Sequence, residues 1–198
     1  MLTRLLSVFF VAFLGLSKVI AQKDIFLEKG KKPKQVEKTQ VTFNLLSPGI
    51  DVEFGIFKNQ TISGGLGLGL ATYKEGYLYG LAVNSRYRYY YNFDRRVALN
   101  KEIAGNSGNY IAAAQAIFFS QLRLGTNIEG PKDFIIGFYG LVHGLQRTTK
   151  KGFNFNAELG AGYYQGDGVP SGVGPLVHFK FGWVPTKRKS KSIYWKED

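Results

Sequence analysis

Charged residues recur in this sequence at alternate positions, the spacing that places side chains on one face of a β-strand. The six candidates are Asp51, Glu53, Arg86, Arg88, Glu158 and Lys180. Charges that share a protein interior have to be paired or hydrogen-bonded. We therefore predict one charge network with two alternative roles. It could line a polar conduit, or it could form a salt-bridged plug, which we favour.

The two histidines are the side chains best suited to acid–base catalysis, because imidazole titrates near neutral pH. A base activates a nucleophile only within hydrogen-bond reach. Neither His143 nor His178 is followed by Ser or Thr in the next two positions, and the chain has no Cys. We expect both to be lumen-facing residues satisfied by their neighbours. The sequence predicts no catalytic residue, no metal site and no cofactor.

These side chains have to be positioned by strands, because from residue 41 onward the dominant hydrophobic period is two. Six segments alternate cleanly: 41–45, 50–56, 61–70, 77–91, 153–163 and 177–183. Two further segments, 109–120 and 134–146, are apolar on both faces and are assigned as strands from their length and their Gly and aromatic content. In 134–146 we place one set inside (Gly137, Tyr139, His143) and another outside (Phe134, Ile136, Phe138, Val142).

Side-chain size decides which face points inward. The polar faces combine glycines with the six charges, a mixture that can fill the narrow interior of an eight-stranded barrel. The apolar faces are bulky and aromatic, as on the lipid side of a membrane barrel. The candidates for an interfacial aromatic girdle are Tyr89, Tyr91, Tyr163 and Trp183. We therefore predict an all-β fold, an eight-stranded antiparallel up-and-down transmembrane β-barrel.

The N-terminus has the features of a secretory signal peptide. Arg4 is followed by an apolar run over 5–16, and Val19 and Ala21 are the small residues before a cleavage point. Lys18 ends the run before the roughly 20 residues that a spanning helix needs. The net charge is +12, but an exported protein does not meet nucleic acid in the cell, so we do not expect this charge to serve nucleic-acid binding.

Four segments follow from these patterns. They are a signal peptide (1–21), a basic periplasmic linker (22–40), an outer-membrane barrel (41–185) and a basic C-terminal tail (186–198). With the linker in the periplasm, the connections at 58–59, 93–108 and 148–152 are periplasmic turns. The connection at 93–108 is long for such a turn.

The pattern resembles a family of small, mostly uncharacterised outer-membrane β-barrel proteins from Bacteroidetes. The resembling stretches are 43–50 with Glu53, 86–92 with Arg95 and Arg96, 106–110, and 152–164. The resemblance covers most of 41–184 and implies the architecture and the outer membrane, but no defined activity. One departure is that outer-membrane barrels often finish on an aromatic residue, whereas here a tail follows Trp183.

We expect a non-enzymatic barrel with a structural or interaction role. Its expected partners are outer-membrane lipid, the barrel-insertion machinery and an acidic protein or headgroup at the basic extensions. The alternatives are an enzyme acting on outer-membrane lipid, a soluble lipocalin-like ligand binder and a small pore. Barrels that deacylate lipid A are similar in size but carry a Ser two residues after a His, which neither His143 nor His178 has.

Overall fold

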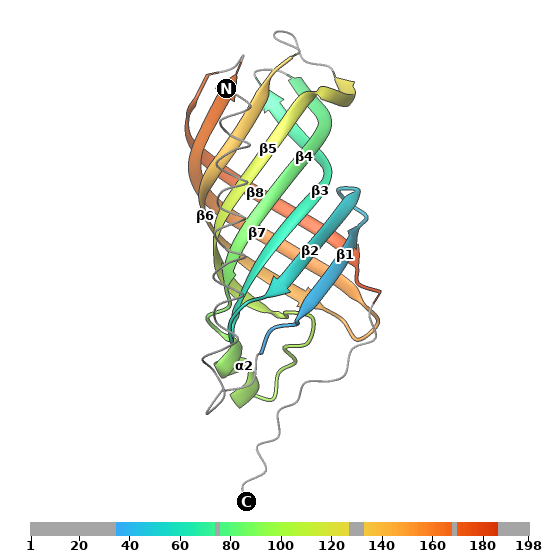
Figure 1. Cartoon of the computed structure of the whole chain (residues 1–198), viewed down its shortest axis with the longest axis vertical. Coiled ribbons are helices and arrows are strands. Elements are labelled where there is room, and N and C mark those ends of the chain that lie inside the picture. The colour runs from blue at the N-terminus through green and yellow to red at the C-terminus, as the bar shows by residue number, and fades with distance from the viewer. Residues whose placement is uncertain (1–34, 74–75, 127–132, 168–169, 186–198) are drawn as a thin grey trace, which may run out of the picture. The chain divides into compact units, whose positions relative to one another are not determined.

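The computed structural model describes residues 35–73, 76–126, 133–167 and 170–185. In chain order its elements are β1 (Thr39–Asn44), β2 (Gly49–Gly55), β3 (Gln60–Tyr73), β4 (Gly76–Tyr89), α2 (Phe93–Ala98), β5 (Gly108–Thr126), β6 (Ile135–Thr148), β7 (Phe153–Asp167) and β8 (Gly172–Trp183). The eight strands form an antiparallel up-and-down sheet that closes into a barrel (Figure 1). This confirms the predicted all-β, eight-stranded architecture.

The strands follow the alternation of the sequence. β1 begins at Thr39, so the end of the expected linker is already part of the barrel, and Gln35 and Val36 before it are buried. The two segments that were apolar on both faces are β5 and β6. The expected signal peptide (1–21), most of the linker (22–34) and the C-terminal tail (186–198) lie outside the described residues.

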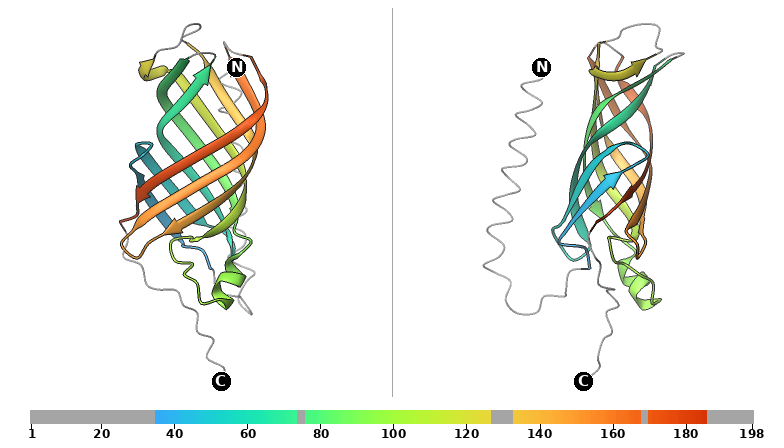
Figure 2. Two further views of the ribbon diagram at one scale, coloured as in Figure 1. Left: turned by 180° about the vertical axis from the view of Figure 1, so that it is seen from behind. Right: turned by 90° about the vertical axis from the view of Figure 1, so that its right-hand side faces the viewer.

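The ring is closed unevenly. β1 and β2 have 6 and 7 residues, whereas the other strands have 12 to 19. β1 and β8 share only two residue pairs, Phe43 with Trp183 and Asn44 with Gly182. Beyond the β1–β2 hairpin, the last third of β3 and most of β8 each pair with one strand only. Figure 2 shows the hairpin occupying only one half of the barrel wall.

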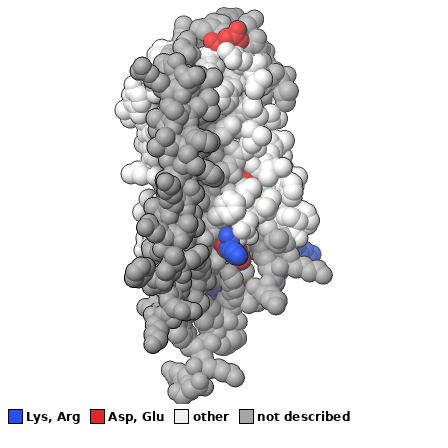
Figure 3. Space-filling model, in the orientation of Figure 1, with Lys and Arg blue, Asp and Glu red and all other residues white. Residues whose placement is uncertain are grey.

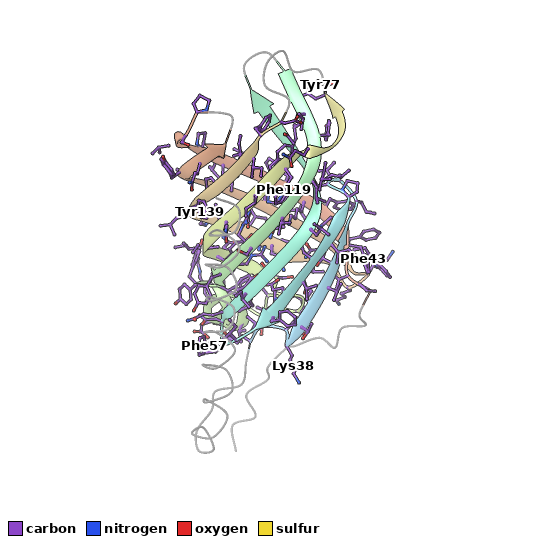
Figure 4. The ribbon with its side chains drawn as sticks, turned by 45° about the horizontal axis from the view of Figure 1, so that its top comes forward. Lys38, Phe43, Phe57, Tyr77, Phe119 and Tyr139 are labelled. Carbon is purple, nitrogen blue, oxygen red and sulfur yellow. The ribbon has the colours of Figure 1, made fainter. Side chains whose placement is uncertain are left out.

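The two faces of the wall differ in chemistry. Large apolar side chains point outward, and Leu159, Leu141 and Val177 are 63%, 65% and 58% exposed. In Figure 4, Phe43 and Tyr139 project away from opposite sides of the barrel. The face seen in Figure 3 is largely uncharged over the strands. On β2, β4 and β7 the inward positions carry glycine, small residues and polar groups, as the alternation predicted.

The prediction for β6 was wrong in its facing. Phe138 and Val142 are 2% and 1% exposed and lie inside, whereas Leu141 is 65% exposed outside. Tyr139 and His143 share the outward face with Leu141, so the expected lumen position of His143 is also wrong. The reason is that both faces of this strand are apolar, so alternation could not tell one from the other.

The long connection between β4 and β5 is a structural element. It carries α2, and residues 103–107 after the helix are all buried. It lies at the end of the barrel that also carries the β2–β3 and β6–β7 turns, which we call the α2 end. β3, β5 and β7 run to the opposite end, whereas the β1–β2 hairpin ends part-way along the wall. The connection at 93–108 is therefore long because it is a segment folded against the barrel and not a simple turn.

Candidate functional site

Glu158 on β7 is the centre of the lumen network. Two nitrogens of Arg86 donate to its Oε2 at 3.1 Å, and the Tyr110 hydroxyl donates to its Oε1 at 2.8 Å. His178 Nδ1 lies 3.2 Å from Oε2, and Arg88 Nη2 lies 3.7 Å from Oε1. The carboxylate is therefore surrounded by donors from β4, β5 and β8.

Glu53 on β2 forms the second centre. Arg88 Nη1 lies 3.2 Å from its Oε2, so Arg88 bridges the two glutamates. Thr61 and Tyr90 donate their hydroxyls to Glu53 Oε1 at 2.6 and 2.8 Å. The Arg88 guanidinium also lies 4.8 Å from the centre of the Tyr110 ring, a cation–π distance.

The third part of the network is the pair of Asp51 and Lys180. Lys180 Nζ donates to both carboxylate oxygens at 2.7 and 2.8 Å, and Asn44 donates to the same carboxylate. Their side chains are 18% and 10% exposed, so this pair is wetter than Arg86 and Glu158, at 2% and 1%. The six predicted residues thus lie in one lumen, with three carboxylates facing three cations.

A buried ion pair contributes little net stability by itself, since desolvation offsets much of the attraction, but removing one partner is strongly destabilising. The network therefore constrains which strands face each other more than it adds free energy.

The α2 end of the lumen is closed by the connection between β4 and β5. Phe93 stacks on Tyr90 with ring centres 4.6 Å apart, and Tyr90 in turn contacts Tyr110 at 5.2 Å. The Gly105 carbonyl accepts hydrogen bonds from Gln146 and Thr148 at 3.3 and 2.7 Å. These contacts attach the connection, which we call the base plug (residues 90–107), to the interior of β6.

The short stretch of chain before β1 is hydrogen-bonded to the base plug. Asn106 Oδ1 accepts the backbone N–H of Glu37 at 2.8 Å, and Glu37 Oε1 accepts the N–H of Gly105 at 2.9 Å. Gly105 and Asn106 have φ of +63° and +54°, a left-handed pair that glycine and asparagine adopt at low cost. On the same segment, partial burial lowers the pKa of Arg96, and Glu102 opposes that shift.

The other half of the lumen is apolar. It is lined by Leu78, Ala82, Phe118, Phe134, Ile136, Phe138, Val142 and Leu176, which we call the apolar lumen. Phe118 and Phe134 stack with ring centres 6.1 Å apart. The charge network thus occupies the half of the barrel next to α2, and the lumen changes character towards the opposite end.

The histidines lie on different faces. His178 is inside and contacts Glu158 as described. His143 is outside, where its Nε2 lies 2.8 Å from the hydroxyl of Tyr91. Each ring has a polar partner, and neither partner is a serine or threonine. No group of three or more His, Asp or Glu side chains in the described part of the chain is arranged to hold a metal ion.

The four girdle candidates all project outward. Tyr89, Tyr91 and Trp183 lie at the α2 end and are 44%, 44% and 41% exposed. Tyr163 is 49% exposed and lies towards the opposite end. Other exposed aromatic residues accompany them at the α2 end (Phe43, Phe153, Phe155, Phe181) and at the opposite end (Tyr77, Tyr79).

Sequence reasoning missed several members of the site. Tyr90 and Tyr110 bond the two glutamates, and Gln146 and Asn156 connect them further through a 3.0 Å hydrogen bond. Tyr90 had a usable signal, because it continues the inward parity of Arg86 and Arg88. Tyr110 and Gln146 lie on the two strands whose faces the pattern could not distinguish.

Comparisons with models of protein families, with curated proteins and with solved structures found no match to this chain. A search of the described residues for a helix long and apolar enough to cross a membrane found none. Function has therefore to be inferred from the geometry of the barrel.

Proposed function

We propose that this chain is an exported outer-membrane β-barrel with a structural or interaction role, of the kind found among small barrels of Bacteroidetes. The observation that carries the proposal is the combination of a bulky apolar outer wall with a charged interior. A barrel that folds in water is expected to have the reverse arrangement, since monomeric soluble proteins rarely expose a large contiguous apolar surface.

The outer wall supports this proposal along the whole barrel. Aliphatic side chains such as Leu159 and Leu141 cover its middle, and exposed aromatic residues lie towards both ends. Several aromatic residues also have their polar atoms satisfied, as in the hydrogen bond from Trp183 Nε1 to the Lys151 carbonyl at 3.2 Å. Such side chains suit the boundary between hydrocarbon and water. A soluble lipocalin-like binder would instead be expected to expose polar side chains on its outer wall.

The interior favours a closed, non-enzymatic barrel over a pore. Its charges are bonded to one another across the lumen, and the base plug fills the α2 end. Gln35 bonds to Lys58 in the β2–β3 turn and Val184 bonds to Gly152 in the β6–β7 turn, so both described ends of the chain lie at the α2 end and the basic extensions would leave the barrel on one side of the membrane. We propose that this side is periplasmic and that an acidic partner or anionic headgroups meet the extensions there. Nucleic acid is not among the proposed partners.

Membrane fractionation tests the proposal. Expressed with its N-terminus in a bacterium with two membranes, the chain should be processed, sediment with the outer membrane, resist extraction at high pH and require detergent for release. Assembly should also depend on the barrel-insertion machinery. Recovery of folded protein in the soluble periplasm without detergent would contradict the proposal.

A further inference from the structure

The wall of the barrel has an opening between β3 and β8. Pairing of β3 with β2 ends at Gly67, and the Leu68 N–H makes a last hydrogen bond to the Pro48 carbonyl at 2.9 Å. On the other side, the last contact of β8 with β1 is the Phe181 carbonyl, which accepts the Leu45 N–H at 2.8 Å. Over residues 69–73 and 172–180, the described strands β3 and β8 have no pairing partner on the facing edge.

Both edges direct backbone groups into this opening. Successive residues of an antiparallel strand point their N–H and C=O to alternate neighbours. Because the backbone N–H of Leu68 bonds towards β2, the backbone N–H and C=O of Leu70 also point into the opening. Because the backbone carbonyl of Phe181 bonds towards β1, the backbone groups of Val177 and Phe179 point into the opening from β8. Such groups are costly against hydrocarbon, so an occupant that offers a hydrogen-bond partner is favoured there over one that is wholly apolar.

The β8 edge is poorly suited to accept another strand. Pro175 has the same parity as Val177, so it has no N–H to offer at the edge. Its carbonyl already accepts a hydrogen bond from the Tyr164 hydroxyl at 2.6 Å. A strand added at this edge could therefore form no hydrogen bond with the backbone of Pro175, which has no N–H and whose carbonyl is already bonded.

Behind the opening lies the apolar lumen. Ala82, Ile136 and Leu176 pack inside against the buried aromatic residues, yet each keeps partial exposure, so they border a space that the buried side chains do not fill. The lumen is narrow, because a methyl group added at Gly69 would lie 2.9 Å from the Ala82 methyl and 3.2 Å from the Phe118 ring, so glycine at this position leaves room for Phe118. A narrow apolar space suits a single extended hydrocarbon chain.

We infer that the opening admits one acyl chain of a bilayer lipid, with the chain in the apolar lumen and its ester carbonyl accepting a hydrogen bond from a free N–H of one edge. An acyl ester matches both halves of the site, since its tail is apolar and its carbonyl is a hydrogen-bond acceptor. The inference rests on the proposed function, because only a membrane-embedded barrel presents this opening to lipid tails.

Tryptophan quenching by phospholipids brominated along their acyl chains tests the inference. All probes are Phe→Trp changes in full-length chain carrying Trp183→Phe and Trp195→Phe, reconstituted in phosphatidylcholine vesicles. Phe118→Trp reports on the apolar lumen, Phe179→Trp on the outer wall and Phe93→Trp on the base plug. Phe134→Trp replaces Phe118→Trp if the latter does not fold.

We expect brominated lipid to quench the lumen probe to an extent similar to that of the outer-wall probe, and to leave the base-plug probe unquenched. Ala116 packs against the buried cluster that includes Phe138, so adding Ala116→Phe should fill the apolar lumen and remove the quenching of the lumen probe alone. A quenched wall probe with an unquenched lumen probe overturns the inference while the membrane barrel stands. Quenching of the lumen probe by aqueous acrylamide would show that water fills the space. Chemical cross-linking that yields a dimer would show that a second copy of the chain covers the opening. Either result overturns the inference. A folded protein whose wall probe is unquenched contradicts the proposed function itself.

Discussion

Arg86 and Glu158 join opposite walls of the barrel, since two Arg86 nitrogens donate to Glu158 Oε2 at 3.1 Å from β4 to β7. The two strands are not neighbours in the sheet, so this pair crosses the lumen. Both side chains are almost fully buried, at 2% and 1% exposed. The pair therefore fixes the distance between two walls that backbone hydrogen bonds do not connect directly.

Glu158→Ala should be strongly destabilising, because it leaves the Arg86 guanidinium buried without its carboxylate. Breaking a buried pair in this way costs about 3–5 kcal/mol. The measurement is the urea midpoint of unfolding in vesicles, followed by intrinsic fluorescence. Glu158→Gln is the matched control, since it keeps the volume and a hydrogen-bond acceptor and should lose less. Equal, small losses for both variants would show that the pair has no structural role.

The pair of Asp51 and Lys180 should matter less, because it is partly exposed to water. We expect Lys180→Met to lower the free energy of unfolding by less than Glu158→Ala does. A double-mutant cycle with Asp51→Asn should give a coupling of about 0.5–3 kcal/mol, as for residues in direct contact. A coupling of zero would mean that the two charges are held independently by other neighbours.

Leu159→Arg and Leu99→Arg distinguish a lipid-facing wall from an ordinary surface. Both leucines are exposed, at 63% and 53%, but Leu159 lies on the outer wall and Leu99 follows α2. Arginine near the bilayer midplane costs about 2–4 kcal/mol, so only Leu159→Arg should reduce the free energy of unfolding in vesicles. In a barrel that folds in water, both changes would have similar small effects.

Planar-bilayer recordings should show no conductance steps for the unaltered protein, because the charge network and the base plug fill one half of the lumen. Phe93→Ala removes the ring that stacks on Tyr90 and should cost about 3–5 kcal/mol, as large-to-small core changes do. Its recordings should still be silent, since the charge network remains. Steps from the unaltered protein would revive the hypothesis of a small pore.

The strands could be predicted from sequence wherever one face was polar. β2, β4 and β7 alternate apolar residues with charged or amide side chains, so both their extent and their facing followed from the pattern. β6 could be recognised as a strand, but its facing could not, because Phe138 points into an apolar lumen and Leu141 points out. An apolar half-lumen removes the contrast on which such predictions depend.

The base plug could not be anticipated for a different reason. α2 has 6 residues, and Asn92 before it makes no side-chain cap, so its helical signal is weak. Its packing also depends on contacts between distant segments, such as Glu37 with Asn106. The six charges could be placed in one lumen from parity, but which carboxylate meets which cation depends on strand stagger, and sequence parity does not encode it.

The seam between β1 and β8 also has a consequence for folding. This interface joins the first and last strands of the barrel through two residue pairs. All other interfaces between the described strands join strands that are consecutive in the chain. Contacts between distant residues form slowly, because a long loop has to be closed first. We expect the hairpins from β3 to β8 to assemble before the seam, which makes ring closure the final and most easily reversed step. Amide hydrogens of Asn44 and Gly182 should then exchange by local opening, well before those at the centre of the β4–β5 interface.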